Sequence, residues 1–281
     1  MTDPSAFQVF QGSAHRPYYR RRRRMAALLI HGFPGTPAEF RPLERALARR
    51  GWSTCAPLLP GFGPDVLRLG EFRSDDWLDT ALRAARQLSA MHSPFMIAGY
   101  SMGAALAAQV AREVRCDGVA LLAPFWKLEG GWISAAWPLL RRVFRSVRPL
   151  RRANFADPKL TAGIAEFLPG LDLQDPDVQQ AVREFAVPTS LIEELLKAGR
   201  GLARAVPTLE MPLLIVQGLE DPLVRRKRTR ALLREVRAPL EYVEVPGAHN
   251  LLDPESPGHD RLLRHVTGFA ESLHLGRRSS A

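Results

Sequence analysis

The chain has 281 residues, of which 46% are hydrophobic and 24% are charged. This composition is that of a globular protein able to bury a sizeable core, and it excludes a disordered or fibrous chain. The formal net charge of +10 at pH 7 rests mainly on arginine. Because no zinc-finger spacing or RNA-binding signature accompanies it, we expect no nucleic-acid partner.

The sequence also restricts the compartment. No window approaches the length of uninterrupted apolar residues that a membrane span needs, and residues 1–11 lack the apolar stretch of a secretory signal. The two cysteines, Cys55 and Cys116, lie far apart and do not suggest a disulfide framework. We therefore expect a cytoplasmic protein.

Short apolar runs alternate with amphipathic helical patterns along most of the chain. Strands are predicted at residues 7–10, 25–30, 54–59, 95–98, 118–122, 213–217 and 240–245. Helices are predicted to begin at the capping-box sequence Thr36-Pro37-Ala38-Glu39 and at Ser74, and to cover 104–114, 226–236 and 261–274. Such alternation is typical of a mostly parallel sheet covered by helices on both faces. The arginine run 20–24 is interpreted as a solvated loop rather than a dedicated binding patch.

The alternation breaks between residues 125 and 207, where helical patterns and prolines occur without a strand-like run. We therefore predict an α/β core of residues 1–124 and 208–281 with an inserted helical cap at 125–207. The insertion is expected to lie over the carboxyl edge of the sheet, where ligands bind in open α/β folds.

One predicted cap helix, residues 139–152, would carry an apolar face and a basic face. The apolar face consists of Leu140, Val143, Phe144 and Val147, and the basic face of Arg141, Arg145, Arg148 and Arg152. Two interpretations are open. The helix is either an ordinary cap helix with its arginines in water, or a lid that makes peripheral contact with an anionic membrane or an acidic acyl carrier.

The motif Gly99-Tyr100-Ser101-Met102-Gly103 stands between a predicted strand and a predicted helix. A sharp turn from strand to helix exposes the serine hydroxyl, and the small glycines let the two elements approach closely. The backbone N–H groups at the start of the helix favour negative charge at the same place. Because the motif alone is common, the interpretation depends on partners elsewhere in the chain.

Three further loops at the same edge carry such partners. His31-Gly32-Phe33 follows the strand at 25–30, Gly218-Leu219-Glu220-Asp221 follows the strand at 213–217, and Pro246-Gly247-Ala248-His249 follows the last strand. The chain order is thus serine, acid, histidine, and the spacing favours Asp221 over Glu220 as the acid. The other histidines, His15, His92, His259, His265 and His274, are expected to be solvated and far from this edge.

With these motifs, the chain resembles the α/β-hydrolase superfamily, and in particular the small bacterial carboxylesterases and monoacylglycerol lipases. The resemblance covers roughly residues 25–124 and 210–274 and is carried by residues 31–37, 57–63 and 99–103. Ala104 stands where those enzymes often have another glycine, and the insertion looks longer than their small caps. The resemblance implies an α/β-hydrolase fold with a helical cap.

The resemblance also implies roles for individual residues. Ser101 would be the nucleophile, His249 the general base and Asp221 the group that orients the imidazole. The backbone N–H groups of Phe33 and Met102 would form the oxyanion hole. His31, Gly32 and Tyr100 would shape the substrate-binding region, His31 by hydrogen bonding within its loop.

No metal-binding or phosphate-binding motif is present in the sequence, so we expect the chemistry to need neither a metal nor a cofactor. Three functions are open. The first is a serine hydrolase acting on a small acyl ester, as a carboxylesterase or monoacylglycerol lipase, through an acyl-enzyme. The second is a thioesterase or acyltransferase on carrier-bound acyl groups. The third is a non-catalytic binding protein of the same fold.

Overall fold

The computed structural model describes residue 10 and residues 12–127, 145–167 and 172–278. Its centre is a seven-stranded sheet in the order β1-β3-β2-β4-β5-β8-β9, in which β1 is antiparallel and the other strands are parallel. The strands of this sheet are β1 (Tyr18–Arg20), β2 (Ala26–Ile30), β3 (Ser53–Ala56), β4 (Phe95–Tyr100), β5 (Gly118–Leu122), β8 (Leu213–Gly218) and β9 (Leu240–Val245).

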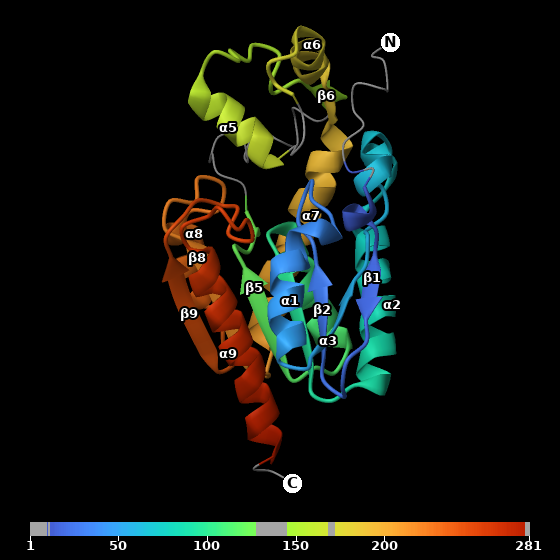
Figure 1. The fold of residues 1–281 in the computed structure, drawn as a ribbon, viewed down its shortest axis with the longest axis vertical. Helices are drawn as coiled ribbons and strands as arrows, with labels where there is room; N and C mark the ends of the chain where they lie inside the picture. The colour runs from blue at the N-terminus through green and yellow to red at the C-terminus, as the bar shows by residue number, and fades with distance from the viewer. Residues whose placement is uncertain (1–9, 11, 128–144, 168–171, 279–281) are drawn as a thin grey trace.

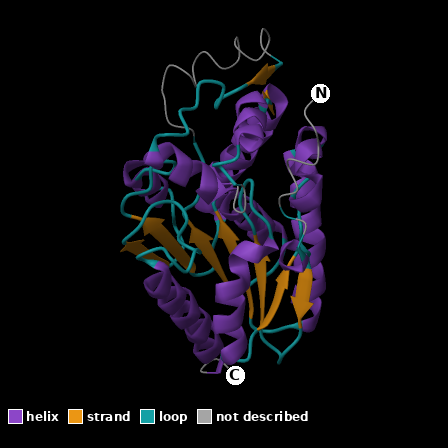
Figure 2. Ribbon diagram, turned by 45° about the horizontal axis from the view of Figure 1, so that its top comes forward, coloured by secondary structure: helices purple, strands orange, loops and turns teal. Residues whose placement is uncertain are grey.

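Helices cover both faces of the sheet (Figure 2). The core helices are α1 (Arg41–Arg49), α2 (Ser74–Met91), α3 (Met102–Glu113), α8 (Arg226–Leu233) and α9 (His259–Arg278). Alternate residues of a strand point to opposite faces, so Leu28 packs with α2 and α3 while its neighbour Leu29 packs with α1 and α9. Because both faces are buried, strands such as Ala26–Ile30 are apolar throughout.

Residues between β5 and β8 form a separate group of elements. They are β6 (Ser146–Val147), α5 (Pro158–Phe167), α6 (Pro176–Glu184), β7 (Val187–Pro188) and α7 (Thr189–Ala205). In Figure 1, α5, α6 and β6 gather at one end of the molecule, while α7 returns to the core and packs against α3. Phe155, Ile164, Leu173 and Val182 form a small apolar cluster of their own within this group.

The prediction of a helix over 139–152 is wrong for residues 145–152, the part that the structure describes. Residues 145–152 form β6 and turns, and β6 pairs antiparallel with β7. Pro149 disfavours helical backbone at Arg148, and this outweighs the helical spacing of the arginines. Arg145, Arg148 and Arg152 therefore do not share a helical face, and the expectation of no strand between 125 and 207 was also incorrect. Residues Leu140, Arg141, Val143 and Phe144 lie outside the described residues.

Near the N-terminus, the predicted strand at 7–10 needs correction, while the prediction of a solvated arginine run is confirmed for residues 21–24. Residues 7–9 lie outside the described residues, and Phe10 is a buried turn residue with φ 67° rather than part of a strand. The first strand is β1, and it includes the first arginine of the run 20–24. The remaining arginines are exposed, but their backbone is anchored, since the Arg22 N–H donates to Ser53 Oγ and Ser53 Oγ donates to the Arg23 carbonyl.

The predicted helix start at Thr36 forms a 3-10 turn, Pro37–Phe40, before α1 begins. Thr36 caps it through its hydroxyl, which accepts the Ala38 N–H at 3.3 Å. Glu39 was expected to complete the capping box by bonding back to the backbone of Thr36. Its carboxylate instead accepts the N–H of Gly32 at 3.2 Å.

Gly103 offers a test of the tight contact between α3 and β2. A Cβ on Gly103 would overlap the Ile30 carbonyl oxygen, whereas a Cβ on the exposed helical Gly268 would meet nothing. We expect Gly103→Ala to lower the free energy of unfolding by about 1–3 kcal/mol, and Gly268→Ala to raise it by roughly 0.5–1 kcal/mol. Urea unfolding of both variants measures this, and equal stabilities would contradict the close approach.

Candidate active site

Ser101 occupies the turn between β4 and α3 in a strained conformation. Its φ is 54° and its ψ is −116°, a region that costs a residue with a side chain of the order of 1–3 kcal/mol. Three backbone hydrogen bonds hold it there. The Ser101 N–H donates to the Leu122 carbonyl at 2.8 Å, and the Ser101 carbonyl accepts from Ala104 at 3.1 Å and from Phe125 at 3.2 Å.

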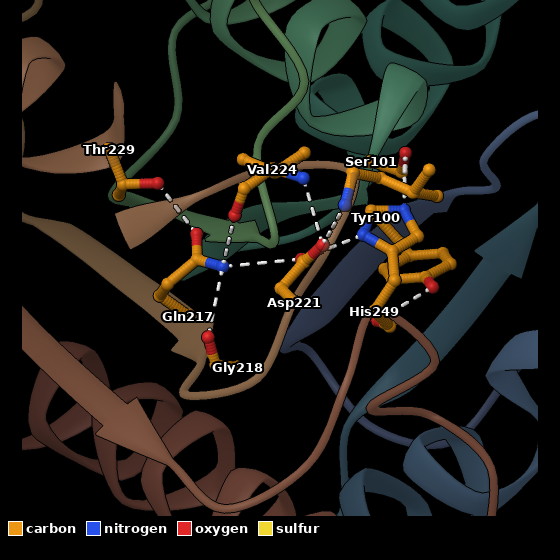
Figure 3. Close-up of polar contacts among 9 residues, drawn as sticks. Tyr100, Ser101, Gln217, Gly218, Asp221, Val224, Thr229 and His249 are labelled. Atoms are coloured by element: carbon orange, nitrogen blue, oxygen red, sulfur yellow. Dashed lines mark hydrogen bonds and ion pairs between the residues drawn. The ribbon is translucent and has the colours of Figure 1, made fainter. Parts of the chain in front are cut away.

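His249 and Asp221 come to Ser101 from the loops after β9 and β8 (Figure 3). His249 Nε2 lies 2.9 Å from Ser101 Oγ, and His249 Nδ1 lies 2.8 Å from Asp221 Oδ2. A carboxylate only accepts hydrogen bonds, so the network assigns the imidazole proton to Nδ1 and leaves Nε2 free to accept the serine hydroxyl. All three side chains are buried, with 5–7% of each residue exposed.

Asp221 is held by four hydrogen bonds. Its Oδ1 accepts the N–H groups of Leu223 at 2.9 Å and Val224 at 2.8 Å, while Oδ2 accepts from His249 and, at 3.2 Å, from Gln217 Nε2. These four donors compensate for the burial of the carboxylate. Gln217 was not predicted as part of the site, and the one sequence signal for it is that it is the only polar side chain of the otherwise apolar strand β8.

Gln217 is itself fixed by the fold. It is fully buried, and its Oε1 accepts the Thr229 hydroxyl of α8 at 2.6 Å. Its Nε2 also contacts the carbonyls of Gly218 and Val224 (Figure 3). Helix α8 is thereby connected through one buried amide to the carboxylate that contacts His249.

Glu220, the alternative acid, faces elsewhere. Its carboxylate accepts the Gly247 N–H at 2.6 Å, and its own N–H donates to the Gly247 carbonyl at 3.0 Å. It therefore ties the loop after β8 to the loop after β9. Of the two adjacent acids, only Asp221 contacts the imidazole of His249 in the described chain.

His31 lies inside the loop after β2 and is fully buried. The Leu59 N–H donates to its Nε2 at 3.1 Å, which places the ring proton on Nδ1, where it is donated to the Gly32 carbonyl 2.9 Å away. Burial lowers the pKa of His31 to about 4. Both ring nitrogens are engaged by backbone, so His31 orders its loop rather than presenting a group to a substrate.

The peptide between Gly32 and Phe33 carries the N–H predicted to bind an oxyanion. The His31 imidazole donates to the carbonyl of this peptide, and Glu39 accepts the N–H of Gly32, which belongs to the preceding peptide. Within the described part of the chain, no acceptor takes the N–H of Phe33 or of Met102. Both N–H groups are therefore available, that of Phe33 in the loop after β2 and that of Met102 at the first residue of α3.

Tyr100 contacts His249 through both its hydroxyl and its ring. Its hydroxyl donates to the His249 carbonyl at 2.9 Å, and the two rings lie 5.3 Å apart. Tyr100 and His249 both line a cavity of about 730 Å³ between the 33–45 segment and the loop at 248–257. Gly32 does not line this cavity, and a Cβ there would crowd Tyr100 and Ser101.

Two of the histidines expected in solvent are buried instead. His92 bonds to the Arg24 carbonyl and the Tyr19 hydroxyl, and His259 lies 3.3 Å from the Leu251 carbonyl. His15 lies nearer the site than expected, because it bonds to Thr36 and lines the same cavity as His249. The positions of His15 and His92 depend on contacts with segments remote in sequence, which the local pattern does not contain.

Comparison with known proteins shows which proteins this chain resembles. The model of the alpha/beta hydrolase family matches residues 27–262. The chain belongs to the alpha/beta hydrolase family. The match spans the four loops that meet at Ser101 and the insertion between β5 and β8.

The similar hydrolases include two bacterial proteins. A thermostable monoacylglycerol lipase of Bacillus sp. strain H-257 is 31% identical over 101 residues, which are 36% of this chain and 40% of the lipase. The chain thus spans less than half of that lipase. A carboxylesterase of Bacillus subtilis strain 168 is 22% identical over 254 residues, covering 88% of this chain and 93% of the esterase.

Solved structures agree in fold with this hydrolase. A structure from work on LipS and LipT, two metagenome-derived lipolytic enzymes, superposes with a TM-score of 0.71 at 21% identity, covering 92% of this chain and 98% of the other. The monoacylglycerol lipase of Paleococcus ferrophilus superposes with a TM-score of 0.68 at 16% identity, covering 92% and 99%. The expected α/β-hydrolase fold is confirmed. None of the described helices is long and apolar enough to cross a membrane.

The lowered pKa of His31 makes a prediction about acid stability. The unfolded chain binds a proton at this histidine below about pH 6.5, while the folded chain does not until about pH 4. Its contribution is complete above pH 6.5 and is lost as the pH falls towards 4, by up to about 3 kcal/mol. Urea unfolding at pH 7 and pH 4.5 should show a smaller difference for His31→Gln than for wild type. An unchanged pH dependence would contradict this.

Proposed function

We propose that this hydrolase cleaves carboxylic esters by serine catalysis, as a carboxylesterase or a monoacylglycerol lipase. The observation that carries the proposal is the buried chain of hydrogen bonds from Ser101 Oγ through His249 to Asp221, at 2.9 and 2.8 Å. A serine hydroxyl needs an adjacent base, and the base needs a third group to orient it. The similarity to bacterial esterases and lipases supports an ester as the substrate class.

In the acylation half of the reaction, Ser101 Oγ attacks the ester carbonyl carbon while His249 Nε2 takes the hydroxyl proton. Asp221 stabilises the imidazolium that forms. The carbonyl oxygen becomes an oxyanion and accepts the N–H groups of Phe33 and Met102, the latter at the first residue of α3. The C–O bond to the alcohol then breaks, and the alcohol leaves with the proton from His249.

Deacylation repeats these steps with water. His249 removes a proton from water, the hydroxide attacks the acyl carbon, and the carboxylic acid leaves as Ser101 regains its proton. Each oxyanion donor contributes about 3–4 kcal/mol in comparable hydrolases. The strained turn at Ser101 holds its hydroxyl 2.9 Å from His249 Nε2, at the N-terminus of α3.

Reaction with a fluorophosphonate probe tests the nucleophile. We expect wild type to be labelled and Ser101→Ala to be unlabelled, because only an activated serine attacks the phosphorus atom. Rates on p-nitrophenyl esters of increasing acyl length then measure the acyl group that the site accepts. A folded wild-type protein that is neither labelled nor active would favour a non-catalytic binding protein.

Substitution of Asp221 and of its neighbour Glu220 tests which of the two acids orients His249. Asp221→Asn should lower kcat by about 10³–10⁴-fold, because the amide no longer fixes the imidazole in the required tautomer. Glu220→Gln keeps an oxygen that can accept the Gly247 N–H and should retain activity within a few-fold. Steady-state kinetics on one p-nitrophenyl ester compare the two variants, and equal losses would contradict the assignment of Asp221.

A further inference from the structure

The carboxyl group of Glu39 lies against the loop that carries the oxyanion donor. Its Oε2 accepts the Gly32 N–H at 3.2 Å, and its side chain lines the cavity that Phe33 and His249 also line. Glu39 is half-buried. Within the described ranges, no lysine, arginine or histidine forms an ion pair with it. A helix-capping role, the usual one for this sequence position, leaves this placement unexplained.

Gly35 makes room for the carboxyl group. A Cβ on Gly35 would overlap both carboxyl oxygens of Glu39, so the turn from Phe33 to Thr36 closes directly over this side chain. The contact to Gly32 is thus enclosed between the loop and the 3-10 turn Pro37–Phe40. The two segments are held together by one side chain.

Gly32 is restrained at both ends as a result. Glu39 accepts its N–H, and the His31 imidazole donates to its carbonyl. The carbonyl belongs to the same peptide plane as the Phe33 N–H, so the two bonds together decide which way that N–H points. A peptide free to rotate would turn the donor away from Ser101.

We propose that Glu39 is a positioning residue for ester hydrolysis, which holds the Gly32 N–H and thereby directs the Phe33 N–H towards the oxyanion. The inference rests on the serine-hydrolase function proposed above. Glu39 does not touch the reacting atoms in this assignment. It acts through the peptide that does.

The charge state of the carboxyl group fits this role. Burial raises the pKa of Glu39 to about 8, although the Gly32 hydrogen bond opposes the rise. At pH 7 the group is therefore largely neutral, and it can accept the Gly32 N–H without placing a negative charge beside a developing oxyanion.

The primary test compares Glu39→Leu, which removes the acceptor, with Glu39→Gln, which keeps a neutral one. At pH 7 we expect Glu39→Leu to lower kcat on a p-nitrophenyl ester by about 10- to 100-fold with KM nearly unchanged, because one oxyanion donor is misdirected. Glu39→Gln should remain within about threefold of wild type. Urea unfolding of each variant confirms that the chain is folded.

Gly35→Ala keeps Glu39 but displaces its carboxyl group, so it should lower kcat in the same way. This variant decides the matter where Glu39→Leu does not fold. The proposal is overturned if folded Glu39→Leu and Gly35→Ala both keep the kcat of wild type. It is also overturned if the loss appears in KM alone, or if Glu39→Gln loses as much as Glu39→Leu.

The ratio of wild-type to Glu39→Gln kcat between pH 6 and 9.5 adds a readout that loss of packing would not change. We expect the ratio to be constant below about pH 7.5 and to fall several-fold above pH 8, as Glu39 ionises beside the oxyanion. A ratio independent of pH would overturn the placement of this carboxyl group.

Several other ionisable groups face the same loop or cavity. They are His31 in the loop after β2, His15 before β1, Arg41 and Arg45 on α1, Tyr100 on β4, and His249, Asp253 and Glu255 after β9. These groups are identical in both proteins, so their titration cancels in the ratio.

Fluorophosphonate labelling separates the two possible failures. Wild type that is neither labelled nor active would refute the serine-hydrolase function and this inference with it. Wild type that is labelled at Ser101 and hydrolyses esters, beside Glu39→Leu and Gly35→Ala proteins of equal kcat, would refute only the role of Glu39.

Discussion

The crowded turn at Ser101 is the constraint on which the rest of the structure depends. A serine at φ 54° is stable only where the surrounding contacts exclude its ordinary backbone conformations. Those surroundings are the backbone of β5 and of the segment that follows it, which bond to both the N–H and the carbonyl of Ser101. Gly99 and Gly103 are required because a Cβ on either would overlap the backbone of Gly103 or of Ile30.

The groups around Ser101 are each supported by a second layer of buried contacts. Asp221 is anchored by two backbone N–H groups and by Gln217, and Gln217 by Thr229. On the opposite side, the Gly32 peptide unit is restrained by His31 and Glu39. Since hydrogen bonds strengthen in a site of low dielectric constant, these buried supports fix the His249 imidazole and the Phe33 N–H more precisely than exposed contacts would.

Much of the core could be predicted from the sequence because its signals are local. The apolar run 118–122 coincides with β5, the segment 240–245 with β9, and helix α2 begins at the predicted Ser74. The loops that bring Ser101, Asp221 and His249 together could be placed because parallel strands end at one edge of a sheet. The distances between these side chains then follow from the fold, and the sequence pattern does not contain them.

Apart from the helix predicted at 139–152, which Pro149 interrupts locally, the failures come from interactions between distant segments. Strand β1 is short and polar, and it exists because Tyr18–Arg20 pairs with β3. The pair β6 and β7 likewise depends on a partner about forty residues away, as the register Ser146 with Pro188 shows. Glu39 has the spacing of a capping-box residue, so the sequence pattern predicts a helix cap. Its contact with Gly32 depends on the way the 33–36 loop folds over its side chain, which the pattern does not contain.

The hydrogen bond from Phe125 to the Ser101 carbonyl has an implication for how such enzymes diversify. Phe125 is the first residue of the predicted insertion, and Ala123 before it also takes a positive φ of 43°. The first residues of the insertion thus belong to the structure that holds Ser101 in its strained conformation. Because these bonds are made by backbone atoms, a replacement of the insertion would preserve the turn only if the new segment kept the same backbone path through residues 123–125.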